Sequence, residues 1–261
     1  MSRLKVSGLT VHRGQRATLR DVSFEASGGE LIGVVGPNGS GKSTLMKAIL
    51  GLLPHGGETT LEGDAIQTLS LNQRARKIAY LPQDREVAWG VSVEQLVALG
   101  RAPYTSAFGA SNTADQQKVE SAMMDMEVMD LRAQAVNRIS GGELARVLMA
   151  RALAQDTPFL LADEPNAGLD PAHQLHLMSI LRRIVTKGQT ILVSLHDLNL
   201  AVRWCSRVLV IRDGTLQADG APKNTLTPEL LASVFGIEAF CGEASQGGTV
   251  IIPVRRLDSE T

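Results

Sequence analysis

The stretch Gly36-Pro37-Asn38-Gly39-Ser40-Gly41-Lys42-Ser43-Thr44 decides the fold predicted for this chain. An apolar run at residues 31–35 precedes it, and apolar residues at helical spacing follow it as far as Gly51. A strand, a glycine-rich turn and a helix in this order, with this spacing of Gly, Lys and Ser, are typical of a loop that binds phosphate. The alternative, a glycine-rich turn that only joins a strand to a helix, is disfavoured by this context.

Each residue type in the stretch has a chemical reason to be there. Glycines leave room for consecutive backbone N–H groups to turn toward phosphate oxygens, an approach that a Cβ atom would block. The N-terminus of the helix adds partial positive charge beneath the same anion. Lys42 would contact the outer phosphates, and the hydroxyl group of Ser43 would ligate Mg²⁺. The sequence therefore predicts a site for a nucleoside triphosphate and Mg²⁺.

Length and composition limit the classes of protein that fit. With 261 residues the chain can form one α/β domain, or a domain with a subdomain, around a large core. Its 26 basic and 27 acidic residues are interspersed and leave a net charge of −1, which gives no general attraction to nucleic acid or anionic lipid. No apolar run approaches the roughly 20 residues of a membrane-spanning helix, and the N-terminus lacks the apolar core of a signal peptide. We therefore expect a cytosolic protein with no nucleic-acid partner.

Strand and helix signals alternate along the chain, which predicts an α/β fold with a mostly parallel sheet and ligands at the carboxyl ends of its strands. Short alternating runs before the glycine-rich stretch predict an N-terminal antiparallel β subdomain. Capping-box patterns at Ser92, Thr113 and Ser140 predict an inserted α-helical subdomain at residues 88–155. The catalytic core would comprise residues 1–87 and 156–236. The C-terminal tail, residues 237–261, has only a weak pattern.

Polar side chains follow two of the predicted strands. Asp163 and Glu164 come directly after an apolar run, an arrangement that places one carboxylate on hydrated Mg²⁺ and the next beside an attacking water. Alone, this pair is equally consistent with a solvated strand end; together with a phosphate-binding loop it favours a catalytic site. His196 also follows a predicted strand, where an isolated histidine is more often structural.

The segment Ile139-Ser140-Gly141-Gly142-Glu143 resembles the Leu-Ser-Gly-Gly-Gln signature of ATP-binding cassette (ABC) proteins. The chain looks like an ABC nucleotide-binding subunit, with a P-loop NTPase core, over about residues 3–236. In this family the signature of one subunit binds the γ-phosphate of the ATP that the other subunit holds. The free N–H groups and the dipole of a helix N-terminus supply such an anion site.

The remaining family elements occur in the expected order, and the resemblance implies their roles. Gln83 corresponds to the glutamine that touches Mg²⁺, Asp170 closes the loop that crosses the dimer interface, and His196 matches the histidine that bonds the γ-phosphate. The implied catalytic residues are Lys42, Gln83, Glu164 and His196, and the implied Mg²⁺ ligands are Ser43, Gln83 and Asp163. ATP would also contact residues 36–44 and the partner's signature.

Two positions depart from the family pattern. Glu143 replaces the usual glutamine; a carboxylate is unfavourable near phosphate, but a capping box offers it the N–H group of Ser140. Arg13 stands where the family usually stacks an aromatic residue on adenine. Because a guanidinium plane can stack on a base, we predict this role for Arg13. The alternative, in which His12 and Arg13 both face solvent, stays open and leaves adenine selectivity in doubt.

The segment Ala98-Leu99-Gly100-Arg101-Ala102-Pro103-Tyr104 indicates a subclass. It resembles a stretch of the importer ATPases that serve iron–siderophore, haem and cobalamin uptake, in which the nearby surface receives a permease helix. The aromatic residues Trp89, Tyr104 and Phe108 fit either such a contact or packing within the insertion. The resemblance implies a homodimer closing on two ATP–Mg²⁺, transmembrane permease subunits, indirectly a substrate-binding protein, and a place on the cytoplasmic face of the inner membrane.

Other functions stay open. An ABC ATPase that acts on nucleic acid or ribosomes usually carries two cassettes, coiled coils or basic arms, whereas this chain has one cassette and balanced charge. An exporter or lipid-extrusion ATPase is disfavoured only by the resemblance of residues 98–104. A small-molecule kinase with the same loop would leave residues 140–143 and His196 unexplained.

Overall fold

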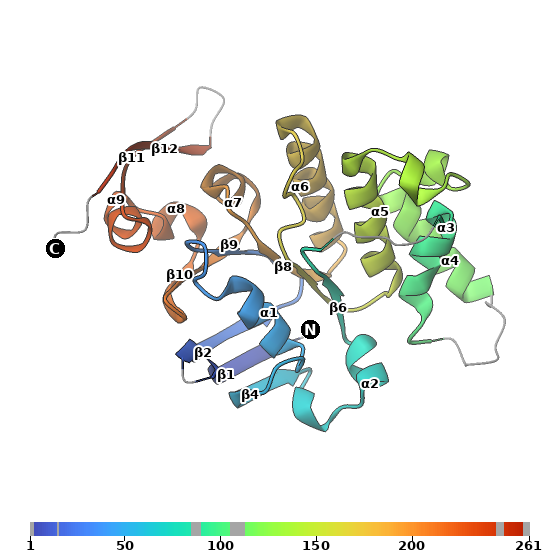
Figure 1. Ribbon diagram of the computed structural model, residues 1–261, viewed down its shortest axis with the longest axis horizontal. Helices are drawn as coiled ribbons and strands as arrows, with labels where there is room; N and C mark the ends of the chain where they lie inside the picture. Colours follow the sequence, from blue (N-terminus) through green and yellow to red (C-terminus); the bar gives the residue numbers. More distant parts are fainter. Residues whose placement is uncertain (1–2, 15, 85–89, 105–112, 244–247, 258–261) are drawn as a thin grey trace.

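The computed structural model describes residues 3–14, 16–84, 90–104, 113–243 and 248–257, and within them the largest sheet has six strands. These are β3 (Leu31–Val35), β6 (Ile78–Leu81), β7 (Phe159–Ala162), β8 (Thr190–Ser194), β9 (Arg207–Arg212) and β10 (Thr215–Gly220). They lie in the order β10-β9-β3-β8-β7-β6, and all neighbours pair in parallel except β9 and β10 (Figure 1). The predicted α/β fold with a mostly parallel sheet is confirmed.

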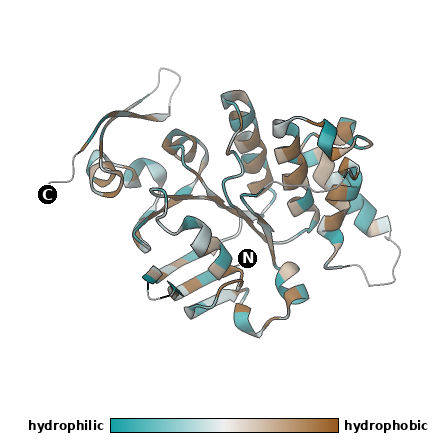
Figure 2. Ribbon diagram, in the orientation of Figure 1, coloured by the Kyte–Doolittle hydropathy of each residue, from teal (hydrophilic) through white to brown (hydrophobic). Residues whose placement is uncertain are grey.

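Strand β3 is buried over its whole length because both faces of the central sheet are covered. Its side chains alternate between two hydrophobic cores: Leu31 and Val35 belong to one, and Ile32 and Val34 to the other. A continuous apolar run is the pattern expected of a parallel strand between two layers. Figure 2 shows this hydrophobic band through the middle of the molecule.

The N-terminal strands form a second sheet on one side of the central sheet. Its strands are β1 (Arg3–Arg13), β2 (Arg16–Ser27), β4 (Gly56–Leu61) and β5 (Asp64–Ala65), paired antiparallel in the order β2-β1-β4-β5. Helix α1 (Lys42–Ile49) contributes Leu45 and Met46 to the core that this sheet shares with the central sheet (Figure 1). The predicted antiparallel subdomain is confirmed, and a short helix, α2 (Leu71–Ala75), leads from it to β6.

The helical insertion packs beside the β6 end of the sheet (Figure 1). It contains α3 (Val93–Ala98), α4 (Thr113–Asp125) and α5 (Gly141–Ala154). The capping boxes predicted at Ser92 and Ser140 are both present. Helix α4 begins at Thr113. Residues 85–89, with Trp89, and residues 105–112, with Phe108, lie outside the described residues.

Two residues of the segment that indicated an importer subclass, Gly100 and Arg101, are buried within this insertion. Arg101 is 8% exposed; its Nε lies 2.8 Å from Asp115 Oδ1, and its Nη1 donates to the carbonyl oxygen of Ala154 at 2.8 Å. The ring of Tyr104 lies 3.9 Å from the Arg101 guanidinium carbon. A Cβ atom on Gly100 would lie 2.1 Å from the carbonyl oxygen of Arg151. The described part of this segment therefore has a packing role of its own.

Arg101→Ala is expected to lower the free energy of unfolding by about 3–5 kcal/mol, because it leaves the carboxylate of Asp115 buried without its cation. Arg132→Ala is the matched control, since its partners Glu94 and Glu120 are more than a third exposed. Loss of that exposed cluster should lower the free energy of unfolding much less than loss of the buried pair. Urea unfolding of both variants measures the difference, and equal losses would contradict the structural role of Arg101.

The rest of the chain covers the other end of the sheet. Helix α6 (Pro171–Val185) precedes β8, and α7 (Leu198–Trp204) follows it. After β10 come α8 (Pro222–Thr225), α9 (Pro228–Leu230) and a π-helical turn, Leu231–Phe235. The last helix predicted at residues 226–236 is therefore present as a short α-helix that continues into the π-helical turn.

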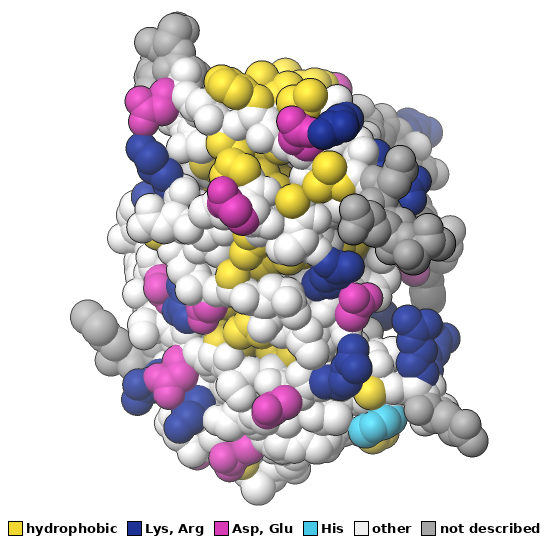
Figure 3. All heavy atoms as spheres, turned by 90° about the vertical axis from the view of Figure 1, so that its left-hand side faces the viewer, with side chains coloured by type: hydrophobic (Ala, Val, Ile, Leu, Met, Phe, Trp, Pro, Cys, Tyr) yellow, Lys and Arg dark blue, Asp and Glu magenta, His cyan; other side chains and the backbone are white. Residues whose placement is uncertain are grey.

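The tail with a weak sequence pattern folds as an antiparallel hairpin of β11 (Ile237–Glu243) and β12 (Thr249–Arg256). Asn199 on α7 holds it: its Oδ1 accepts the N–H of Ile251 at 2.8 Å, and its Nδ2 donates to the carbonyl oxygen of the same residue at 3.1 Å. The outer face keeps Phe240, Ile252 and Val254 exposed. Apolar residues on both faces obscure the alternation by which a strand is recognised. Figure 3 shows this side of the molecule, with hydrophobic side chains gathered near its top and charges of both signs below.

Candidate nucleotide-binding site

The glycine-rich loop connects β3 to α1 and encloses the side chain of Lys42. The ammonium group donates to the carbonyl oxygens of Gly36 at 2.9 Å and Pro37 at 3.1 Å. Burial lowers the pKa of Lys42, while the negative charges of Glu164 and Asp163 act in the opposite direction. The lysine is thus desolvated, oriented by the loop and faced by two carboxylates, so an incoming anion would meet a directed positive charge.

Two glycines of the loop are required by close approach as well as by backbone conformation. A Cβ atom on Gly36 would lie 2.0 Å from the carbonyl oxygen of Ile211 at the end of β9. Gly41 has a φ of +111°, and its Cβ would lie 2.8 Å from Leu19 Cδ2 on β2. The loop therefore rests directly on the ends of two strands, which fixes where its N–H groups can point.

Asp163 and Glu164 meet Ser194 where β7 and β8 end side by side. Asp163 is 2% exposed, and the hydroxyl group of Ser194 donates to its Oδ1 at 2.7 Å. The same hydroxyl accepts the backbone N–H of Glu164 at 2.7 Å. Tyr80 lies on the other side, with its hydroxyl 3.5 Å from Asp163 Oδ2; burial, and then the charge of Asp163, raise the pKa of Tyr80. Ser194 thus orients both the carboxylate of Asp163 and the backbone of Glu164.

The carboxylate of Glu164 joins side chains from three strand ends. Its Oε2 accepts a hydrogen bond from Gln83 Nε2 at 2.8 Å, and its Oε1 lies 2.5 Å from His196 Nε2. Glu164 has a φ of +49°, a left-handed conformation that is uncommon outside glycine. Strained backbone of this kind is found preferentially at functional sites, where the surroundings enforce it. The geometry can hold a carboxylate next to a reacting water.

Ser194→Ala is expected to reduce ATP hydrolysis about 10- to 100-fold and to raise the Mg²⁺ concentration needed for half-maximal rate, because the carboxylate of Asp163 loses its orienting donor. Thr190→Val is the matched control. Thr190 lies on the same strand, at the end opposite Ser194, and is fully buried. Its hydroxyl donates to the carbonyl oxygen of Ser27 on β2. Both variants should lose stability, but only Ser194→Ala should change the Mg²⁺ dependence. An unchanged Mg²⁺ dependence would rule out a positioning role for Ser194.

A cleft of about 600 Å³ brings most of the predicted site residues together. It is lined by Arg13, Asn38, Gly39, Ser40, Gly41, Lys42, Ser43, Thr44, Gln83, Glu164 and His196, with Thr18 from β2. Asp163 lies directly behind it, bonded through Ser194 to the backbone of Glu164. Gly36 and Pro37 form the rear of the loop and hold the ammonium group of Lys42. The predicted signature residues Ser140, Gly141, Gly142 and Glu143 and the loop residue Asp170 do not line this cleft.

The signature segment forms the N-terminus of α5 as predicted. The Ser140 hydroxyl accepts the N–H of Glu143 at 3.3 Å, and the Glu143 carboxylate accepts the N–H of Ser140 at 2.7 Å. That second bond is the main reason why the pKa of Glu143 is lowered. The carboxylate that replaces the usual glutamine is therefore occupied by its own helix end, as the sequence pattern predicted.

His173 is a site neighbour that the sequence interpretation missed. Asp170 caps α6 by accepting the N–H of His173 at 3.0 Å, and His173 Nδ1 lies 2.6 Å from the other carboxylate oxygen. These bonds, the backbone one first, lower the pKa of Asp170. A Cβ atom on Gly142 would lie 2.9 Å from the His173 ring. The signature helix and the Asp170 loop are therefore in contact within one chain.

The donor set suits Mg²⁺. A hydroxyl (Ser43), an amide (Gln83) and a carboxylate (Asp163) are hard oxygen donors, and Mg²⁺ is usually bound by one or two protein groups together with phosphate oxygens. The described residues contain no group of three or more His, Cys, Asp or Glu that could hold a metal ion by themselves. A site completed by phosphate oxygens agrees with both observations.

The loop, the carboxylate pair and the polar strand ends together define a P-loop nucleotide-binding protein. The family model described as "ABC transporter" matches residues 19–167, which contain the loop, the signature segment and the carboxylate pair. The chain belongs to the ABC transporter family.

Curated relatives are similar over nearly the whole chain. The cobalamin import ATP-binding protein of Halobacterium salinarum is 39% identical over 95% of this chain, which spans 63% of that relative's length. The hemin import ATP-binding protein of Pseudomonas fluorescens is 39% identical over 97% of this chain and 100% of its own. The ferric enterobactin transport ATP-binding protein of Escherichia coli is 34% identical over 100% of this chain and 97% of its own.

Solved structures share the fold. A putative metal-chelate type ABC transporter in an inward-facing conformation superposes with a TM-score of 0.85, at 24% identity, over 98% of both chains. An ATP-binding cassette solved as a dimer in a post-hydrolysis state, bound to ADP and Pi, gives a TM-score of 0.73 at 27% identity, over 84% of this chain and 98% of that chain. Among the described residues, no helix has the length and apolar character needed to cross a membrane.

Proposed function

We propose that this chain is the ATP-hydrolysing subunit of an ABC import system that drives a membrane permease for a metal chelate of the iron–siderophore, haem or cobalamin type. The relatives named for hemin, cobalamin and ferric enterobactin support this substrate class. The observation that carries the mechanism is the composition of the cleft. It gathers the phosphate loop, Gln83, Glu164 and His196 but not the signature residue Ser140.

Two copies complete two sites by facing each other. At the N-terminus of α5 the capping box occupies the N–H groups of Ser140 and Glu143 and leaves those of Gly141 and Gly142, together with a partial positive charge. In a single chain this end lines no part of the cleft. Placed across the cleft of a second copy, residues 140–143 bind the terminal phosphate that this copy holds, with Asp170 at the interface. The dimeric cassette structure bound to ADP and Pi supports this arrangement.

Each residue of the cleft has a distinct role. Lys42 and the N–H groups of residues 38–44 bind the β- and γ-phosphates, and Arg13 stacks on the base. Ser43, Gln83 and Asp163 would hold Mg²⁺, which when bound would supply positive charge beside the phosphates. Glu164 orients the attacking water and accepts its proton, and His196 donates a hydrogen bond to the γ-phosphate. Catalysis is mainly positioning plus charge stabilisation.

Closing and reopening of the two copies drives the conformational change of the permease. The catalytic core (residues 1–87 and 156–236) carries the nucleotide, the helical insertion (88–155) contacts the permease, and residues 237–261 form a C-terminal appendage. The protein acts in the cytoplasm, bound to the inner membrane through its permease, and a substrate-binding protein delivers the chelate from the other side. Nucleic acid has no part in this cycle.

Reconstitution in liposomes tests the proposal. The chain is purified with the permease that co-purifies with it, and chelate uptake is measured with ATP inside or outside the vesicles. Movement of the chelate away from the side that carries the ATPase would show export and contradict the proposal. Failure to find any permease partner would support only an ATPase without a transport role. Stimulation of ATP hydrolysis by haem-, siderophore- or cobalamin-loaded binding protein identifies the cargo.

A further inference from the structure

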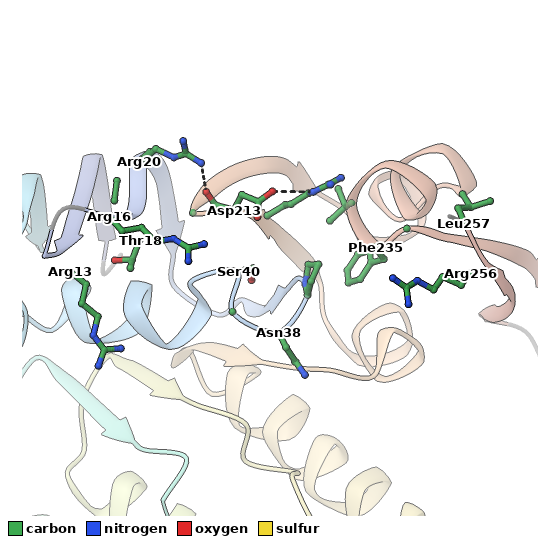
Figure 4. A pocket seen from close by; sticks show the side chains of 17 residues that line it. Arg13, Arg16, Thr18, Arg20, Asn38, Ser40, Asp213, Phe235, Arg256 and Leu257 are labelled. Atoms are coloured by element: carbon green, nitrogen blue, oxygen red, sulfur yellow. Dashed lines mark hydrogen bonds and ion pairs between the residues drawn. The ribbon is translucent and has the colours of Figure 1, made fainter. Parts of the chain in front are cut away.

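A second hollow adjoins the nucleotide cleft and is rich in arginine (Figure 4). It has a volume of about 1010 Å³, and its lining includes Arg13, Arg16, Arg20, Arg212 and Arg256. Asp213 is the one carboxylate among the described residues that line it. These side chains come from the β1–β2 hairpin, the end of β9 and the end of β12, so the fold gathers them from three separate parts of the chain around a concentrated positive charge.

Much of this charge is left without a counter-charge. The carboxylate of Asp213 lies 3.3 Å from Arg212 Nε, and its backbone oxygen accepts a hydrogen bond from Arg20 at 2.7 Å. Across the described part of the chain, no carboxylate lies within ion-pair distance of Arg13, Arg16 or Arg256. Such a cluster stands out in a chain whose net charge is −1. Like charges held together favour an anion between them.

The geometry points to a binding site for a small polyanion that carries phosphate groups, separate from the ATP in the cleft. Arginine is suited to phosphate because its planar fork donates two parallel hydrogen bonds. Figure 4 shows the guanidinium groups of Arg16 and Arg256 on opposite sides of the hollow. Phe235 and Leu257 line one end, so the ligand can also carry an apolar group such as a base.

The two hollows have separate chemistry and a common wall. Lys42, Glu164 and His196 line the nucleotide cleft only, and Arg16 and Arg256 line the arginine-rich hollow only. The common wall consists of Arg13, Thr18 and residues 38–40 of the phosphate loop. A polyanion in the second hollow neutralises the arginines and lowers the positive potential that attracts ATP at this wall. It therefore weakens ATP binding, and ATP weakens its binding by the same factor.

Calorimetric titration of the full chain with tripolyphosphate, at an ionic strength near 0.15 M that screens loose surface binding, tests the site. The Lys42→Ala protein serves as background, because it lacks the main charge of the phosphate loop. We expect tripolyphosphate to bind wild type and Lys42→Ala with affinities within about threefold of each other. Arg16→Gln and Arg256→Gln, which remove the positive charge but keep a polar side chain, should each weaken binding about tenfold or more.

Arg255→Gln is the matched control, since Arg255 neighbours Arg256 on β12, pairs with Glu238 and does not line the hollow. It should leave the affinity within about twofold of wild type. Loss of binding in Lys42→Ala would place the anion in the phosphate loop and overturn the proposal, as would equal binding by all three arginine variants. ADP titrated into the Lys42→Ala protein shows whether a nucleotide is the preferred source of the phosphates. Both readouts are independent of ATP hydrolysis, so failure of the proposed function would leave them unaffected.

Discussion

Glu164→Gln is expected to reduce ATP hydrolysis by about 10²- to 10⁴-fold while ATP binding is retained, because the amide cannot accept the proton of the attacking water. The side chain is 11% exposed and held between Gln83 and His196 in the cleft, and glutamine has the same shape. Since the proposed dimer reopens only after hydrolysis, this variant should accumulate as an ATP-bound dimer. Phosphate release measures the rate, and size-exclusion chromatography with and without ATP–Mg²⁺ measures the dimer.

Glu127→Gln is the control for this experiment. Glu127 also has a positive φ, +55°, but it pairs with Arg183 and His176 away from the cleft. It should hydrolyse ATP at close to the wild-type rate and form no stable dimer. Turnover by Glu164→Gln within a few-fold of wild type would remove Glu164 from the role of general base. If Glu164→Gln bound ATP normally but stayed monomeric with ATP–Mg²⁺, the proposal of a site shared between two copies would be wrong.

Lys42→Ala is expected to weaken ATP binding about 10- to 100-fold, since a charge-assisted hydrogen bond to phosphate is worth roughly 1.5–3 kcal/mol. The expected loss is specific to this lysine because the loop carbonyls of Gly36 and Pro37 hold its ammonium group in place. Displacement of a fluorescent ATP analogue measures the dissociation constant. Hydrolysis should fall by at least the same factor at subsaturating ATP.

Lys47→Ala provides the comparison on the same helix, because Lys47 is exposed in the last turn of α1. Its dissociation constant for ATP should stay within about twofold of wild type. If Lys42→Ala changed the dissociation constant by no more than Lys47→Ala, the phosphate role of the loop lysine would be wrong. Far-UV circular dichroism of both variants separates loss of binding from loss of structure.

The strands and helices that position the site could be predicted because each has a strong local pattern. Continuous apolar runs mark β3 and β8, and capping boxes mark α3 and α5. The hairpin β11–β12 was not predicted, because its outer face carries Phe240, Ile252 and Val254. These residues remove the alternation of polar and apolar residues by which a strand is recognised. Its position depends on bonds to Asn199, a residue about 50 positions away in the chain.

The residues predicted to contact ligand could be recognised in the sequence, whereas those that orient them could not. Lys42, Glu164 and His196 follow strands or open a helix in recognisable motifs, and the structure places them in one cleft. Ser194 differs: a single polar residue at the end of an apolar strand was the only signal, and its partner Asp163 is 31 residues away. Register between neighbouring strands decides that contact. Segment 98–104 was recognised by its motif, but the structural role of Arg101 was not. Its burial within the insertion depends on contacts that the motif does not reveal.

The contact between Gly142 and His173 has a mechanical consequence. It joins the helical insertion to α6 of the core, and the glycine presents a bare peptide surface to a flat imidazole ring. Side chains that interdigitate resist displacement, because a close-packed interior must be opened before its parts can slide. A ring lying on backbone has no such interlock. At this contact the ring can therefore slide over the peptide of Gly142 without interlocking, while Asp170 keeps the ring in place from its own side.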